Sequence, residues 1–250
     1  MKIMIKIEFQ KLVESFRFWV SISGIAIGLF LNSLEVMRYT SFVTIDDLFI
    51  RISGGAFFLI CFVFCIVGGG YGFCMEQKNH CVIYSVIRGK IAHYTIAKTI
   101  VSFLGGFLVA FFGCILGIII ISGKLWMCRQ YNGTSFNGLE VGLAYILGVS
   151  LLCGMLSVFA MLISVFIVDY CIVMAMPILI YYMVLNITGW LTLPVWLDIT
   201  HIYYIYFNND DFVLEEFVYS IGYALLFSIC LTFVIYKIMI KGIERKIEHG

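Results

Sequence analysis

Only one charged side chain, Asp169, interrupts residues 141–187, which read VGLAYILGVSLLCGMLSVFAMLISVFIVDYCIVMAMPILIYYMVLNI. A helix needs about 20 apolar residues to cross the hydrocarbon core of a bilayer, and this stretch is about twice that length. We therefore expect two membrane-spanning helices joined by a tight turn near residues 164–170, with Asp169 as the N-cap of the second helix. The alternative is a single span here and five spans in the whole chain.

The same apolar character extends along the whole chain of 250 residues. Hydrophobic residues make up 62% of it and charged residues 12%, whereas a soluble domain has about 25% charged residues. This composition excludes an ordinary soluble domain and predicts an all-α membrane protein. Six apolar runs have the length of a spanning helix: residues 18–34, 52–75, 96–122, 139–165, 168–187 and 217–240.

The distribution of Lys and Arg predicts the orientation of these spans, because positively charged loops tend to stay in the cytoplasm. Placing both termini on the cytoplasmic side puts twelve of the sixteen Lys and Arg residues there. Most acidic residues fall in the segments that this arrangement places outside. We therefore expect six spans with both the N- and the C-terminus in the cytoplasm.

Residues 1–17, which precede the first span, have the pattern of an amphipathic helix. Lys11 and other polar residues occupy one side, and apolar residues recur at helical spacing on the other: Ile5, Phe9, Leu12, Val13 and Phe16. Such a helix lies in the membrane interface with its basic residues toward anionic headgroups. A simple topology anchor is the alternative interpretation. Residues 18–250 then form the transmembrane domain.

A polar block separates the second and third apolar runs and is far longer than the two to five or so residues that a helical hairpin needs. One apolar stripe in it consists of Val82, Ile83, Val86, Ile87, Ile91 and Tyr94, and the opposite side carries Lys78, Asn79, Ser85, Arg88 and Lys90. We expect an amphipathic helix over residues 76–93, which begins at Glu76. It either lies on lipid or docks a cytosolic partner.

A second polar segment, residues 190–215, lies between the fifth and sixth apolar runs and is rich in aromatic residues, including Trp190, Trp196, Tyr203 and Tyr204. Aromatic side chains gather at the headgroup level of a membrane. The segment is too interrupted by polar residues to span the bilayer. We expect short re-entrant or interfacial helices here, on the external side.

The sequence offers no catalytic constellation and no metal-ligand set. We interpret the nine cysteines as small buried hydrophobic residues, because no His or carboxylate set accompanies them. Glycine pairs at four-residue spacing would allow helices to approach closely. These pairs are Gly24 and Gly28, Gly68 and Gly72, Gly113 and Gly117, and Gly138 and Gly142.

The layout resembles the permeases of ABC-2 type ATP-binding-cassette transporters, and among them the small bacitracin- and lantibiotic-resistance permeases. The resemblance rests on the N-terminal stretch IKIEFQKLVESFRFW, on a second span that ends in Glu76, on a basic amphipathic stretch that ends in Lys98, and on the spans that follow. It covers nearly the whole chain. The family's small-residue and Arg turn maps onto Ser85 to Arg88, although the expected glycine follows the arginine, as Gly89.

The resemblance implies a coupling helix at residues 76–93 that rests on a cytosolic ABC ATPase, with Glu76, Lys78, Val82, Ile83, Val86, Ile87 and Arg88 as its docking residues. It also implies a second permease chain, equal or similar, in a bacterial cytoplasmic membrane. The exported substrate would be amphiphilic, such as an antimicrobial peptide or a lipid-like compound. No nucleic-acid partner is expected.

The chain contains no phosphate-binding loop, since GIIIISGKL at residues 117–125 has the wrong spacing. ATP and Mg²⁺ would therefore bind to the partner ATPase, and this chain would hold no cofactor. It also places no ionisable residue near the centre of a span, where an ion-driven transporter needs one.

Two alternatives stay open. A substrate-binding membrane subunit of a vitamin importer would have six spans, but it would not explain the long basic block. An intramembrane CAAX-type protease would have a pair of glutamates such as Glu215 and Glu216, yet position 220 is Ser where that family has Arg.

Overall fold

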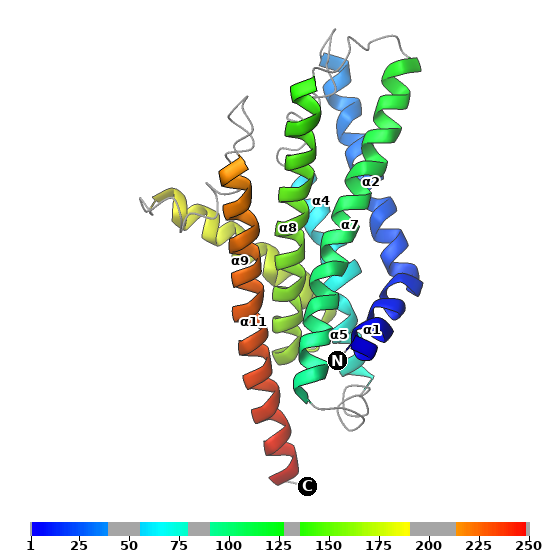
Figure 1. Cartoon of the computed structure of the whole chain (residues 1–250). Coiled ribbons are helices and arrows are strands. Elements are labelled where there is room, and N and C mark those ends of the chain that lie inside the picture. The colour runs from blue at the N-terminus through cyan, green and yellow to red at the C-terminus, as the bar shows by residue number, and fades with distance from the viewer. Residues whose placement is uncertain (1, 40–55, 80–90, 128–135, 191–213, 249–250) are drawn as a thin grey trace.

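The computed structural model describes residues 2–39, 56–79, 91–127, 136–190 and 214–248, and these are almost entirely α-helical (Figure 1). The helices are α1 (Lys2–Glu14), α2 (Phe16–Tyr39), α4 (Ala56–Cys65), η1 (Ile66–Gly70), α5 (Tyr71–Lys78), α7 (Ile91–Met127), α8 (Phe136–Phe166), α9 (Tyr170–Trp190) and α11 (Leu214–Glu248).

Most of these helices run lengthwise in one elongated bundle, whereas α1 lies across its lower end and α9 is oblique (Figure 1). Within the described residues, five helices are long and apolar enough to cross a membrane: Phe16–Leu34, Leu59–Lys78, Ile91–Gly123, Ile146–Phe166 and Ile221–Ile238. The protein is therefore an all-α, multi-pass membrane protein. Both termini lie at the end of the bundle where α5 ends and α7 begins.

The predicted break inside residues 141–187 is confirmed. Helix α8 ends at Phe166 and α9 begins at Tyr170. The carboxylate of Asp169 accepts backbone N–H bonds from Cys171, at 2.8 Å, and from Ile172, at 3.3 Å, as an N-cap does. The apolar part of α9, Tyr170–Val184, is shorter than a full crossing, so the sixth span stays a prediction.

The helix that forms the second span is not uniform. It consists of α4, a π-helical turn η1 and α5, and the backbone N–H of Tyr71 bonds to the carbonyl of Ile66, five residues earlier. The turn contains three successive glycines, Gly68 to Gly70. A π-turn widens the helix locally and is often found at functional sites.

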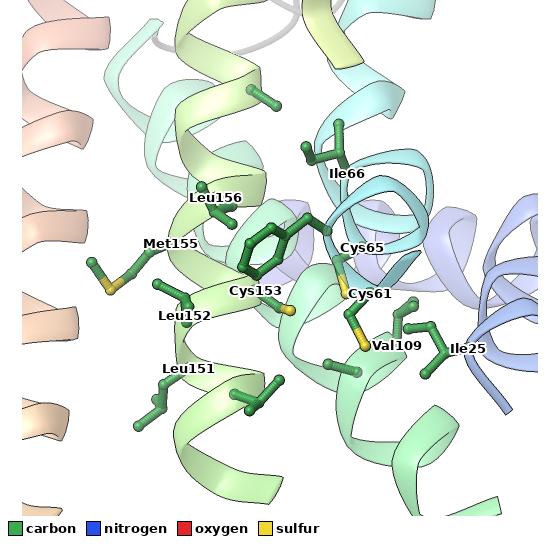
Figure 2. Packing of buried hydrophobic residues seen from close by; sticks show 14 of the residues in the cluster. Ile25, Cys61, Cys65, Ile66, Val109, Leu151, Leu152, Cys153, Met155 and Leu156 are labelled. Atoms are coloured by element: carbon green, nitrogen blue, oxygen red, sulfur yellow. The ribbon is translucent and has the colours of Figure 1, made fainter. Parts of the chain in front are cut away.

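The core of the bundle is built around α8. Of its membrane-spanning stretch, 78% is buried, compared with 11% for the corresponding stretch of α11. Cys61 and Cys65 of α4 face Cys153 of α8 there, among aliphatic side chains (Figure 2). Five of the seven described cysteines are buried. The predicted role of the cysteines as small buried residues is confirmed for these five and is wrong for Cys171 and Cys230, which are exposed.

Two of the predicted glycine pairs make close contacts within the chain. Gly24 and Gly28 of α2 lie against the side chains of Phe64 and Ile60, and Gly113 and Gly117 of α7 lie against Ile25 and Leu29. A side chain at any of these positions would collide with its neighbour. The pairs therefore pack α2 against α4 and α7, which leaves them no free face for a second chain.

The other two pairs differ. Gly68 contacts Val109, but Gly72 has open space around it. The side-chain environment of Gly138 and Gly142 lies outside the described part of the chain.

Candidate functional site

A cluster of charged side chains, in which Glu8 and Lys98 are buried, joins three helices at the end of the bundle that holds both termini. The ammonium group of Lys98, on α7, lies 2.7 Å from a carboxylate oxygen of Glu8, on α1, and 2.7 Å from one of Glu76, on α5. Glu8 is only 5% exposed and Lys98 only 8%. We call Glu8, Lys11, Glu76, Tyr94 and Lys98 the charge cluster.

Lys11 and Tyr94 complete the cluster. Lys11 donates to the second oxygen of Glu8 at 2.6 Å, and its ammonium group lies 3.9 Å from Glu76. The hydroxyl of Tyr94 donates to the other carboxylate oxygen of Glu76 at 2.7 Å. Two carboxylates and two ammonium groups thus compensate one another, which is the condition for burying charges at acceptable cost.

A sharp elbow at Ser15 brings Glu8 into this position. Ser15 separates α1 from α2, its hydroxyl donates to the carbonyl of Leu12 at 2.7 Å, and it accepts the backbone N–H of Phe18 at 3.4 Å. It therefore closes one helix and caps the next. Met4 and Leu12 pack into the two hydrophobic clusters of the bundle, and Glu8 lies one turn from each on the same face.

The environment of Glu8 stabilises its charged form. Burial raises the pKa of the carboxyl, but the positive charges and hydrogen bonds of Lys98 and Lys11 together outweigh burial and lower the pKa below its ordinary value of 4.5. Glu8 is therefore an ionised group at neutral pH, held by two ammonium groups. Such a carboxylate suits a structural or switching contact better than proton transfer at neutral pH.

A cavity of about 190 Å³ lies beside the cluster, between α1, η1, α5 and α7. Its walls include all the charged members of the cluster, together with Arg17 and the three glycines of η1. The volume far exceeds the ~15 Å³ that one water molecule needs. The charged groups therefore border an open space, so they have room to rearrange.

Next to this cavity, η1 packs closely against α7 and α8. The hydroxyl of Ser157, on α8, donates to the carbonyl of Cys65 at 3.0 Å, at the start of the π-turn. Ser102 of α7 in turn donates to the carbonyl of Ser157 at 3.1 Å. A side chain at Gly69 would lie 2.7 Å from the carbonyl oxygen of Ser102. Backbone atoms of three spans therefore meet here, and only glycine fits.

Two residues that the resemblance singles out, Glu76 and Lys98, are brought into direct contact. Lys78 lies in the last turn of α5, with its ammonium group 4.3 Å from the centre of the Tyr170 ring. The predicted coupling helix itself falls mainly on residues 80–90, which lie outside the described residues, as do the docking positions Val82, Ile83, Val86, Ile87 and Arg88.

The predicted interfacial helix corresponds to α1. Ile5, Phe9 and Leu12 are half-buried, and Phe16, the first residue of α2, is 81% exposed. The side chain of Lys11 is 55% exposed and contacts Glu8 and Glu76. Of the external aromatic segment, Trp190 ends α9, whereas Trp196, Tyr203 and Tyr204 lie outside the described part of the chain.

Sequence reasoning missed Glu8, whose side chain is the most deeply buried carboxylate of the cluster. The signal was its spacing, since Glu8 is four residues from both Met4 and Leu12 and so lies on an apolar face. A single carboxylate on such a face needs a buried cation. Lys98 does not contradict the expectation that the centres of the spans lack ionisable residues. It lies only seven residues after the first residue of α7.

Neither family models nor curated proteins match this chain. The charge cluster and its cavity are therefore interpreted from their own geometry. That geometry contains no nucleophile paired with a base, and within the described residues no group of His, Cys, Asp and Glu is arranged to hold a metal ion. The cluster can hold three helices together, and it can release them when its ion pairs exchange partners.

Proposed function

We propose that this chain is the membrane-spanning permease subunit of an ATP-driven exporter of the ABC-2 type, with ATP hydrolysed by a separate subunit. The observation that supports the proposal most strongly is the contact of Lys98 with both Glu76 and Glu8. The resemblance places an acidic residue at the end of span two and a basic residue at the start of span three. Here these two residues are paired, on either side of the proposed coupling segment.

The pairing has a mechanical consequence. Helix α5 ends at Lys78 and α7 begins at Ile91, so the proposed docking segment is attached to the two helices that Lys98 ties together. A displacement of this segment by an ATPase would be transmitted to both helices at once. Glu8 adds α1 to the moving unit. Closure of two ATPases would then tilt these elements and open an outward path.

The rest of the proposal follows the same assignment. A second permease, identical or similar, completes the transporter in a bacterial cytoplasmic membrane, with both termini in the cytoplasm. The common position of the termini at one end of the bundle supports this arrangement. The apolar and aromatic surfaces of the spans favour an amphiphilic substrate, such as an antimicrobial peptide or a lipid-like compound.

Co-purification with an ABC ATPase of the same organism tests the proposal. The tagged chain and the ATPase are expressed together, and the variant Ile83→Asp, Val86→Asp, Ile87→Asp is compared with the unaltered chain. We expect the ATPase to be lost from the variant, because three charges on the apolar stripe would remove its docking face, while the variant still inserts into the membrane.

The matched control is Ser85→Asp, which adds a charge to the opposite side of the same segment and should keep the ATPase bound. Equal recovery of the ATPase with the triple variant and the unaltered chain would refute the docking assignment. Failure of the unaltered chain to retain any ATPase would refute the proposed function itself.

A further inference from the structure

The cavity beside the charge cluster has an excess of positive charge. Its walls carry two carboxylates, Glu8 and Glu76, against three cations, Lys11, Arg17 and Lys98. Both carboxylates are already engaged by the ammonium groups and by Tyr94. The unmatched positive charge in the cavity wall is therefore that of Arg17.

Arg17 is held in place without neutralisation. Its guanidinium carbon lies 5.2 Å from the centre of the Tyr71 ring, a cation–π contact that fixes the side chain but leaves its charge in place. Among the described residues it forms no ion pair. A guanidinium group has five N–H donors in a planar fork, and this shape matches a phosphate group.

The surroundings of the elbow are suited to a membrane interface. Phe16 is 81% exposed, Trp19 is 56% exposed and Val20 is 42% exposed, all at the start of α2. Trp19 also has a polar handle, since its indole N–H donates to the carbonyl of Val13 at 2.9 Å. Aromatic side chains with one polar contact are typical of the headgroup level. Acyl chains would lie on this apolar surface while a headgroup entered the cavity.

We propose that the cavity between α1, η1, α5 and α7 is a binding site for a phosphate group, with Arg17 as its principal ligand and the exposed ammonium group of Lys11 beside it. The phosphate is that of an anionic phospholipid or free phosphate. This site is independent of the proposed transport function, because it rests only on the cavity, the cations and the elbow.

Native mass spectrometry of the purified full chain tests the proposal by measuring the lipid that stays bound. One arm uses phosphatidylglycerol and a second uses phosphatidylcholine. One cation near a membrane surface contributes about 1 kcal/mol, which is about fivefold in binding. We therefore expect the unaltered chain to retain phosphatidylglycerol about fivefold more strongly than phosphatidylcholine. Arg17→Gln should abolish most of this preference. A third arm measures the midpoint of thermal unfolding with inorganic phosphate against chloride at equal ionic strength.

The matched control is Lys237→Gln, which removes the same charge from α11, where Lys237 lies over the Phe233 ring. It should leave the lipid preference unchanged. Arg17→Lys keeps the positive charge but not the planar guanidinium group, so it should retain an intermediate preference for phosphatidylglycerol. This variant replaces Arg17→Gln in the test if Arg17→Gln does not fold. A phosphatidylglycerol preference sensitive to Arg17 identifies a lipid site, and stabilisation by phosphate alone with the same sensitivity identifies a site for the free anion.

Three results would overturn the proposal. The unaltered chain could show neither a preference for phosphatidylglycerol nor stabilisation by phosphate. The lipid preference and the phosphate effect could both survive in Arg17→Gln. The preference could also fall equally in Arg17→Gln and Lys237→Gln, which would indicate general surface electrostatics and not a defined site.

Discussion

Two points on the second span, about two turns apart, are fixed in different ways. At η1, backbone atoms of α7 and α8 approach the glycines so closely that no side chain fits. At Glu76, the span is held by the tips of long side chains beside a cavity of about 190 Å³. Close backbone packing has one arrangement, whereas side-chain ion pairs can exchange partners. The span thus has a rigid crossing next to an adjustable contact.

The largest expected effect is the loss of the central cation. Lys98→Met should leave the buried carboxylate of Glu8 with only the exposed Lys11 as its cation, beside the half-buried carboxylate of Glu76. Removing one partner of a buried pair typically costs up to about 3–5 kcal/mol. The measurement is the free energy of unfolding of the purified protein in detergent, with heat or denaturant used to unfold it. Stability equal to that of the unaltered chain would show that the cluster does not hold α1, α5 and α7 together.

The matched variant removes three of the four charges, as Glu8→Gln, Glu76→Gln, Lys98→Met, and leaves only the exposed Lys11. Neutral groups of similar volume carry no buried charge, so this variant should recover most of the lost stability. If the triple variant is as unstable as Lys98→Met alone, the loss comes from packing and not from uncompensated charge.

The rigid crossing should tolerate even one added methyl group poorly. In Gly106→Ala the new carbon would lie 2.7 Å from the carbonyl oxygen of Cys153, a backbone atom that cannot move aside. Overpacking of this kind costs about 1–3 kcal/mol. Gly72→Ala is the control, because nothing lies within 4 Å of that position and Ala favours a helix by up to about 1 kcal/mol. Equal stability of the two variants would contradict the close packing of α7 against α8 beside η1.

The smallest effect concerns pH. The pKa of Glu8 is lowered in the folded protein, so its ionised form stabilises the fold above the ordinary value of 4.5. This contribution is lost as the pH falls from there through the folded-state pKa. The difference in unfolding midpoint between the unaltered chain and Glu8→Gln should therefore shrink below pH 4.5 and stay constant above it. A difference that grows on acidification would mean that the pKa is raised.

Much of the fold could be predicted because its determinants are local. The apolar length of residues 141–187 and a single aspartate were enough to place the break between α8 and α9, since a cap acts on N–H groups two or three residues away. Burial of five of the seven described cysteines followed from their lack of polar companions. The π-turn could not be predicted, because its glycines are selected by the approach of Ser102 and Ser157 from other helices.

The candidate site was predicted only in part. Glu76 and Lys98 were singled out separately by the resemblance, and Lys11 was assigned to the polar side of the first helix. Glu8 was not assigned, and neither Tyr94 nor Arg17 was placed at the site. The elbow at Ser15 sets how α1 lies on the bundle, and this decides which of its side chains face the other helices. The sequence of α1 alone therefore did not show that Glu8 faces the bundle.

By itself, the sequence determined that this chain is helical, embedded in a membrane and interrupted at Asp169, because hydrophobic length and helix capping act over a few neighbouring residues. Only the tertiary structure decided which charges meet. Glu8 and Lys98 are 90 residues apart in the chain and Glu76 and Lys98 are 22 apart. Their pairing depends on the burial that three packed helices create, since only there does an isolated carboxylate require a cation.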